Sequence, residues 1–263
     1  MSERNIDHVK FMGVKISNAN IFNIKDTIDR VIKNSNKGYI CVTDVGNVIS
    51  ATKDYELLNA INTSLISVAD GMPLVWYAKM LKCKNIERVS GADLMTKLLS
   101  QDNGYRHFLL GDTERTINKV IGRARLLNRN VNISGYSPPF KEFNDEDNLK
   151  ILNIINKEKA DIIWVSFGGG KQEKWMKQVI SKIDTGVVIG VGAAFKWLIG
   201  DLVTPPKIFQ IMGLQWLFRI TQQMIKDPII CSKVLIKNEI IKKKIIFLFN
   251  FPFEVLSGRR NFK

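Results

Sequence analysis

The sequence is poor in the residues that build disulfide frameworks and histidine-based metal sites. It has three cysteines among 263 residues, Cys41, Cys83 and Cys231, which lie far apart and form no CxxC pair. Such a set predicts neither a disulfide scaffold nor a zinc site, and it suits a reducing compartment. The two histidines, His8 and His107, are too few for a histidine-rich metal centre or a convincing Ser-His-Asp triad.

Long apolar runs are missing as well. No uncharged segment approaches the ~20 residues that a membrane-spanning helix requires. The longest one near the end, 208–218, stops at Arg219. The first residues, MSERNIDHVK, are charged from the third position and contain no apolar core. We therefore expect neither a spanning helix nor a secretory signal, and a protein that acts in the cytoplasm.

The charge is large and uneven. The chain carries a net charge of +14, and residues 207–263 hold 11 Lys/Arg against 3 Asp/Glu. A basic, apolar-rich end predicts a polyanionic partner, either nucleic acid or an anionic membrane surface. The alternative is a solvated basic face that only aids solubility. Charge by itself favours that alternative.

Short apolar runs alternate with helix-like segments over the first 200 residues. Most of the runs show no alternation of polar and apolar residues, which is typical of strands buried on both faces. We expect strands at 39–43, 65–69, 107–110, 131–134, 162–167 and 187–191. We expect helices at 24–33, 48–62, 73–81, 92–101, 114–128, 146–158 and 172–182. This pattern predicts a doubly wound, Rossmann-like α/β domain with a parallel sheet over 1–204. The helical pattern after Pro205-Pro206 predicts a basic helical appendage over 205–263.

The predicted strand ends carry the residues of chemical interest, because ligands of open α/β sheets bind at the carboxyl ends of the strands. The residues placed there are Asp44, Asp70, Asp112 and the turns at Gly111, Gly168–Gly170 and Gly190–Gly192. Glycine lets backbone amides approach a ligand, and the helix N-termini that follow favour phosphate. The sequence therefore predicts a nucleotide or another phosphorylated ligand at this edge.

Three motif-like segments have simpler interpretations. Residues 190–195, GVGAAF, lack the third glycine of a dinucleotide fingerprint and predict a tight turn. Residues 168–172, GGGKQ, lack the spacing and hydroxyl of a P-loop. Residues 145–147, DED, open a predicted helix, where acidic side chains are favoured by the helix dipole, so a metal-holding role is disfavoured.

Asp70 is the most informative carboxylate. It follows the apolar run 65–69 and precedes Gly71-Met72-Pro73 and an apolar helix. A partly desolvated carboxylate that faces a cleft is suited to act as a general base. An aspartate ahead of Gly-x-Pro is equally suited to cap the helix. The spacing leaves both roles open.

Seven segments, taken in order, resemble the WecG/TagA/CpsF family of bacterial glycosyltransferases. The clearest is DGMPLVW at 70–76. The others are VT and NV at 42–43 and 47–48, ERVSGADL at 87–94, SPPF at 137–140, WVSFG through KQEKWM at 164–176, GVGAAF at 190–195 and GLQWLFR at 213–219. The resemblance covers about residues 38–228.

The resemblance implies an inverting, metal-independent transferase that needs no cofactor. It implies transfer of a hexose, such as N-acetylmannosamine, from a UDP donor to a sugar on undecaprenyl diphosphate at the cytoplasmic membrane face. The product would serve teichoic acid, capsule or exopolysaccharide synthesis. Asp70 matches the family's catalytic base. Thr43, Arg88, Gln172 and Arg219 match residues of its pocket, and Asn47, Gly111, Gly168 and Gly192 complete the expected substrate site.

The end of the chain suits the lipid-linked acceptor. Residues 240–253 read IIKKKIIFLFNFPF. We expect Lys242, Lys243 and Lys244 to reach anionic headgroups while Phe247 and Phe249 enter the membrane interface. The alternative is a buried helix or an oligomer contact, because phenylalanines two residues apart make no helical stripe. Family members are often oligomers, so self-association is also expected.

Departures from the family pattern motivate a second hypothesis. Lys196, Gly170 and Gln215 stand where relatives usually carry Asp, Pro and Glu. A catalytically degenerate member would act at the membrane as a binding or assembly protein. A third hypothesis, a nucleic-acid-binding protein, rests on charge alone. The sequence shows neither a stacking module nor a helix-turn-helix signal, so we expect no nucleic acid partner.

Overall fold

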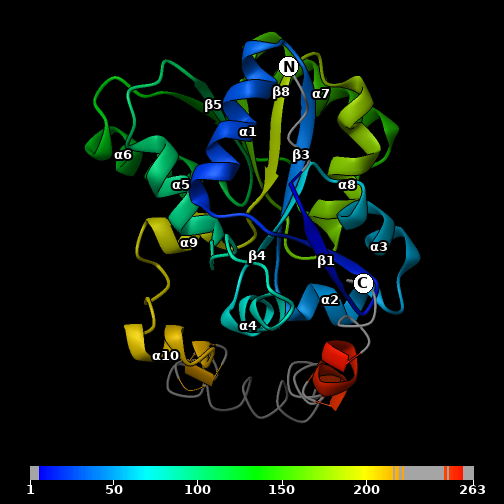
Figure 1. The fold of residues 1–263 in the computed structure, drawn as a ribbon. Coiled ribbons are helices and arrows are strands. Elements are labelled where there is room, and N and C mark those ends of the chain that lie inside the picture. Colours follow the sequence, from blue (N-terminus) through cyan, green and yellow to red (C-terminus); the bar gives the residue numbers. More distant parts are fainter. Residues whose placement is uncertain (1–5, 216, 219–220, 222–245, 248, 257–263) are drawn as a thin grey trace.

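A six-stranded parallel sheet forms the centre of the computed structural model, which describes residues 6–215, 217–218, 221, 246–247 and 249–256. Its strand order is β4-β3-β8-β7-β5-β6, and Figure 1 shows the sheet between its covering helices. The strands are β3 (Lys37–Thr43), β4 (Ile66–Ala69), β5 (Arg106–Gly111), β6 (Asn132–Tyr136), β7 (Ile162–Ser166) and β8 (Gly186–Gly190). All six predicted strands are confirmed, with small shifts at their ends.

Helices cover both faces of the sheet, so the doubly wound, Rossmann-like prediction is confirmed. Along β3, Tyr39 and Cys41 belong to one buried cluster, and Ile40 and Val42 belong to the other. This alternation follows from the two-residue period of a strand. On the first face lie α2 (Val45–Ala51), α3 (Tyr55–Asn62), α4 (Met72–Met80), α7 (Asp145–Glu158) and α8 (Lys171–Val179). On the second face lie α1 (Ile21–Lys33), α5 (Gly91–Leu99), α6 (Glu114–Leu127) and α9 (Ala194–Leu198).

Helix boundaries follow side-chain caps that the sequence displays. The predicted helix 48–62 is two helices, because the Asp54 carboxylate accepts a hydrogen bond from the Leu57 backbone N–H and starts α3. Asn144 caps α7 in the same way, which confirms the predicted helix start at that acidic run. The helix predicted at 172–182 is α8, which ends earlier, at Val179. The chain continues from there as a 3₁₀ turn, Ile180–Lys182. The short helix α9 was not predicted.

An N-terminal hairpin was also not predicted. It consists of β1 (His8–Phe11) and β2 (Val14–Ser17), which pair antiparallel. Met12 and Gly13 turn the chain with φ values of 49° and 82°, the conformation of a tight two-residue hairpin loop. The pattern VKFMGVKI alternates apolar and polar residues on both sides of Met-Gly, and that signal would have found the hairpin.

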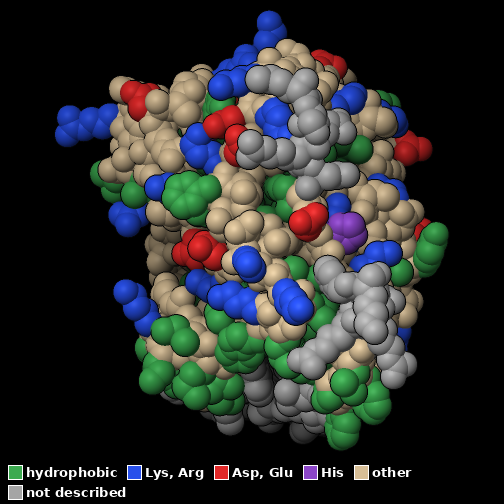
Figure 2. Space-filling view, viewed as in Figure 1, with side chains coloured by type: hydrophobic (Ala, Val, Ile, Leu, Met, Phe, Trp, Pro, Cys, Tyr) green, Lys and Arg blue, Asp and Glu red, His purple; other side chains and the backbone are tan. Residues whose placement is uncertain are grey.

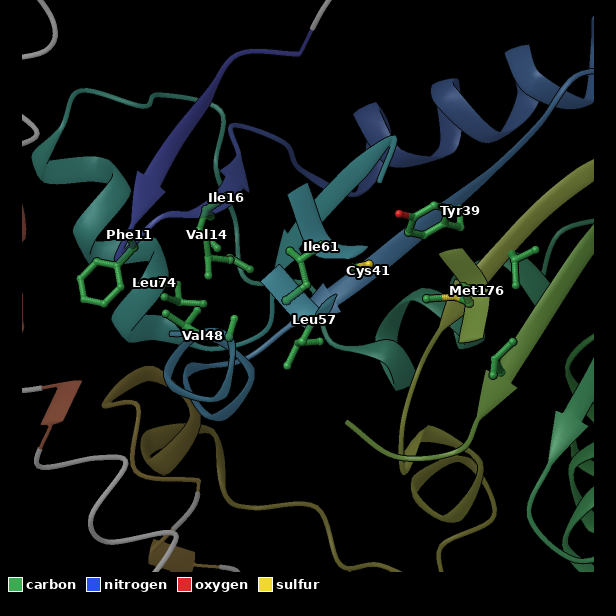
Figure 3. Close-up of a cluster of buried hydrophobic side chains, with 14 of the residues drawn as sticks. Phe11, Val14, Ile16, Tyr39, Cys41, Val48, Leu57, Ile61, Leu74 and Met176 are labelled. Carbon is green, nitrogen blue, oxygen red and sulfur yellow. The ribbon is translucent and has the colours of Figure 1, made fainter. Parts of the chain in front are cut away.

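The first-face core extends from this hairpin to the middle of the sheet. Figure 3 shows Phe11 and Val14 of the hairpin, Cys41 of β3, Leu57 of α3 and Met176 of α8 in this cluster. Phe247 and Val255, near the far end of the chain, belong to the same cluster. The Phe247 side chain is 4% exposed, and its ring centroid lies 4.9 Å from that of Phe11.

These contacts correct one expectation about the membrane. Phe247 is packed inside the protein, so its ring does not reach a bilayer in this structure. Phe249 is 73% exposed, and its predicted role stays a prediction. Lys242, Lys243, Lys244 and Arg219 lie outside the described residues. In the described part of the chain, no helix is both long enough and apolar enough to cross a membrane.

Candidate functional site

The site lies at the carboxyl ends of two neighbouring strands whose following helices cover opposite faces of the sheet. After β3 the chain enters α2 on the first face, and after the neighbouring β8 it enters α9 on the second face. Such a divergence opens a crevice at the carboxyl ends of the two strands. A cavity of about 520 Å³ occurs there, and its walls include Asn47, Asp70, Arg88, Gly168, Gln172 and Gly192. The structure thus brings six of the predicted site residues together.

Asp70 follows β4 directly and is half-buried on the cavity wall. Its backbone N–H donates to the Thr43 carbonyl oxygen at 2.9 Å, which continues the pairing of β3 with β4. The next residue, Gly71, is the N-cap of α4, has a φ of 139° and makes no side-chain cap bond. The N-cap position of α4 is therefore occupied by Gly71 and not by Asp70.

Arg88 connects the cavity wall to the start of the appendage. Its Nη2 donates to Asp93 Oδ2 at 3.0 Å and to Gln210 Oε1 at 3.1 Å. Asp93 is held in turn by the Ser90 hydroxyl at 2.7 Å. Gln210 belongs to α10 (Lys207–Ile211), and it also lines the cavity. The guanidinium is therefore oriented from both sides of the cavity.

Glu173, a buried carboxylate to which the sequence assigned no role, is hydrogen-bonded to two residues of the cavity wall, Asn47 and Gln172. The Glu173 side chain is 0% exposed, and burial raises the pKa of its carboxyl. Its Oε1 accepts hydrogen bonds from Gln172 Nε2 at 3.0 Å and from Asn47 Nδ2 at 3.2 Å. Its Oε2 accepts one from the Gly170 backbone N–H at 2.7 Å. Glu173 thus joins the start of α2 to the start of α8.

Gln172 extends this network to the turn after β8. Its Oε1 accepts a hydrogen bond from the Gly192 backbone N–H at 3.0 Å. Ser166 at the end of β7 donates its hydroxyl to the Gly192 carbonyl oxygen at 2.7 Å. Gly192 has a φ of 55°, and nothing lies within 4 Å of where a Cβ would be. The backbone of this turn is therefore both fixed and open to the cavity.

Two predicted site residues lie elsewhere. Thr43 is fully buried, and its hydroxyl is 2.9 Å from that of Ser67, so the expectation that its side chain lines the pocket is corrected. Thr43 is the last residue of β3, and successive side chains of a strand alternate between the two faces of the sheet. The neighbouring residues Val42 and Asp44 line the cavity instead. Gly111 lines a second cavity of about 520 Å³, together with Pro138, Phe140, Lys171, Phe167 and Trp175.

Lys196, which departs from the family pattern, has an acidic partner. Its Nζ lies 3.6 Å from Asp112 Oδ2 at the end of β5. The other oxygen of that carboxylate, Oδ1, accepts a hydrogen bond from the Thr113 backbone N–H at 2.8 Å. This ion pair joins α9 to the turn that precedes α6.

Metal-type side chains do not gather in the described ranges, where no group of three His, Cys, Asp or Glu residues is arranged to hold an ion. His107 is buried inside the sheet, and its Nδ1 accepts a hydrogen bond from Trp164 Nε1 at 3.2 Å. Burial lowers the pKa of this imidazole to about 4. His107 is thus a neutral structural residue.

Comparisons with known proteins identify the family of the chain. Residues 9–226 match the model of the glycosyl transferase WecG/TagA/CpsF family. Similar curated proteins include N-acetylglucosaminyldiphosphoundecaprenol N-acetyl-beta-D-mannosaminyltransferase from Staphylococcus aureus strains NCTC 8325 / PS 47, COL and N315. Each is 28% identical over 222 residues, which cover 82% of this chain and 85% of the relative.

Proposed function

The chain belongs to the glycosyl transferase WecG/TagA/CpsF family and is a glycosyltransferase, and we propose that it transfers a hexose from a UDP-sugar to a sugar on undecaprenyl diphosphate. The hexose is N-acetylmannosamine or a close relative. The names of the Staphylococcus aureus relatives support this choice, because they specify an N-acetylglucosaminyldiphosphoundecaprenol acceptor and an N-acetyl-beta-D-mannosaminyl group. The product would enter a cell-surface polysaccharide such as teichoic acid, capsule or exopolysaccharide.

The observation that carries the proposal is the composition of one cavity. A carboxylate, Asp70, shares its walls with the Arg88 guanidinium and with the backbone of Gly168 and Gly192. Nothing lies within 4 Å of a Cβ built on either glycine, so a diphosphate has room to approach both backbones. Cations and backbone amides stabilise a leaving diphosphate as its charge develops.

The proposed reaction is a single displacement. The acceptor hydroxyl oxygen forms a bond to the anomeric carbon as its proton passes to the Asp70 carboxylate. The bond from the anomeric carbon to the diphosphate oxygen breaks, and its electron pair leaves with UDP. One displacement inverts the anomeric carbon, so an α-linked donor gives a β-linked product. Arg88 balances charge on UDP, and Arg219 is proposed to assist it. No metal ion is required by this scheme.

The exposed surface of α10 supports a membrane-facing role for the appendage. Ile208, Ile211 and Met212 are more than half exposed, and Figure 2 shows hydrophobic side chains gathered over α10. Exposed apolar patches beside basic residues suit the interface of an anionic membrane. Since Gln210 of α10 contacts Arg88, the patch adjoins the site. We propose peripheral binding at the cytoplasmic face, where the lipid-linked acceptor is presented.

The test is a screen of purified full-length protein against a panel of UDP-sugars, with a short-chain lipid-diphosphate sugar as acceptor. We expect one donor to turn over in the presence of EDTA and to give the inverted product by NMR. Asp70→Asn should lower kcat about 10²- to 10⁴-fold. Asp102→Asn, on an exposed loop, is the matched control and should leave kcat unchanged.

Three results would contradict parts of the proposal. Full activity of Asp70→Asn removes the assigned base. A retained anomeric configuration removes the single displacement. Tight binding of the lipid-linked sugar with no turnover on any donor would instead support a non-catalytic binding protein.

A further inference from the structure

The Glu173 carboxylate fixes how two neighbouring amide side chains are oriented. An ionised carboxylate only accepts hydrogen bonds. Three N–H groups converge on it, from Asn47, Gln172 and the Gly170 backbone. While Glu173 is ionised, the NH₂ groups of Asn47 and Gln172 therefore both point toward it. The usual ambiguity between the oxygen and nitrogen of an amide is removed by this partner.

The two amide oxygens consequently point away from Glu173. Gln172 Oε1 accepts from the Gly192 backbone N–H, which is consistent with this orientation. Asn47 Oδ1 lies beside the backbone of Gly169, 2.6 Å from where a Cβ on that residue would be. Both Asn47 and Gly169 line the cavity that holds Asp70. Asn47 is thus oriented to offer an acceptor rather than a donor.

We propose that Glu173 is a positioning residue that holds Asn47 Oδ1 toward the cavity, and that this oxygen accepts a hydrogen bond from a hydroxyl or amide N–H of a substrate sugar. This inference rests on the proposed function. Ionised phosphate oxygens carry no proton and would be repelled by a second acceptor. The Asn47 position therefore marks the sugar-binding part of the cavity, apart from the diphosphate-binding part.

The kinetic test pairs side-chain variants with sugars that each lack one donor group. Wild-type protein, Asn47→Ala and Glu173→Gln are assayed with single-deoxy analogues of the donor sugar and, separately, of the acceptor sugar. One analogue should lower wild-type kcat/KM about tenfold, the effect of one lost hydrogen bond. The same analogue should cause no further loss in Asn47→Ala, because the partner oxygen is already absent.

Glu173→Gln should weaken the sensitivity to that analogue, since its NH₂ group must face one of the three N–H donors, from Asn47, Gln172 or the Gly170 backbone, and breaks that hydrogen bond. Glu146→Gln, an exposed residue of α7, is the matched control and should keep the wild-type response. A merely structural role for Glu173 would lower activity equally for the parent sugar and its analogues. If every analogue lowers the kcat/KM of Asn47→Ala by the same factor as it lowers that of the wild type, the inference is overturned.

A second readout does not depend on turnover. In ¹⁵N-labelled protein, the side-chain NH₂ signals of Asn47 and Gln172 are identified by their loss in Asn47→Ala and Gln172→Ala. We expect both to exchange slowly with water and to shift in Glu173→Gln. Rapid exchange of the Asn47 NH₂ in the wild type would overturn the positioning role even if Glu173→Gln failed to fold. Absence of any turnover by the wild type would contradict the proposed function, whereas turnover with additive losses contradicts only this inference.

Discussion

Arg88 and Gln210 are joined by a hydrogen bond of 3.1 Å between Nη2 and Oε1, across 122 residues of sequence. The bond connects the wall of the α/β cavity to α10. Arg88 keeps a second partner, Asp93, on the α/β side. A substitution at Gln210 therefore changes the attachment of α10 without leaving the guanidinium unpaired.

Gln210→Ala should lower kcat/KM about five- to tenfold, because one hydrogen bond to a charged group is lost and the cavity wall loosens. The melting temperature should change little. Lys207→Ala, an exposed residue of the same helix, serves as the control. Steady-state kinetics and thermal unfolding check the expectation. Equal kinetics for both variants would show that this contact does not shape the cavity.

Gly169→Ala should disturb the site without unfolding the protein. A Cβ at this position would lie 2.6 Å from Asn47 Oδ1, so the amide must move. We expect a loss of about tenfold in kcat/KM, the scale of one hydrogen bond. Gly122→Ala in α6 has nothing within 4 Å of the new Cβ and should stabilise that helix by ~0.5–1 kcal/mol. Unchanged kinetics for Gly169→Ala would mean that Asn47 does not contact substrate.

His107 should make the fold sensitive to acid. Burial lowers its pKa from 6.5 to about 4, so the unfolded chain binds a proton between these values when the folded chain does not. The contribution of neutral His107 to the free energy of unfolding is therefore fully present above pH 6.5 and is lost as the pH falls toward 4. The linkage amounts to about 3 kcal/mol.

His107→Gln removes the titrating group, and its amide oxygen can still accept from Trp164. Urea unfolding at pH 7 and at pH 4.5 should show the wild type losing stability relative to this variant as the pH falls. His8→Gln on the exposed part of the hairpin is the comparison, because burial also lowers the pKa of His8 and a smaller effect of the same sign is expected. A constant difference between wild type and His107→Gln across this range would contradict the assignment.

The exposed apolar face of α10 should contribute to membrane binding. The double variant Ile208→Ser/Ile211→Ser should weaken binding to anionic phospholipid vesicles at least about tenfold, because each isoleucine contributes about 1 kcal/mol or more when buried. Leu126→Ser, at a still more exposed leucine of α6, is the control. Vesicle sedimentation gives the affinity. Equal affinities for the wild type and the double variant would place the membrane contact elsewhere.

The sheet and most helices could be predicted because their signals are local. Strands buried on both faces are short apolar runs, and side-chain caps such as Thr113 and Asn144 stand directly before their helices. The site was predictable in outline, because Asp70 and the glycine turns must meet where parallel strands end. Thr43 shows the limit of that argument, since one step back along a strand turns a side chain to the other face.

Glu173 could not be assigned from sequence, because its importance arises from a partner far along the chain. Asn47 lies 126 residues before it, and only folding brings the starts of α2 and α8 together. From sequence, a glutamate in the first turn of a helix is expected to be an exposed residue that the helix dipole favours. The structure shows a fully buried carboxylate instead.

The aromatic cluster that joins the two ends of the chain has a practical consequence for protein production. Phe11 of the hairpin, Tyr77 of α4, and Phe247 and Phe251 near the C-terminus share ring contacts. Trimming residues 246–256 to obtain a better-behaved enzyme would strip the cover from Phe11 and Tyr77. The shortened protein would then expose aromatic side chains that favour aggregation. Solubility is better improved by polar replacements on the exposed side of α10.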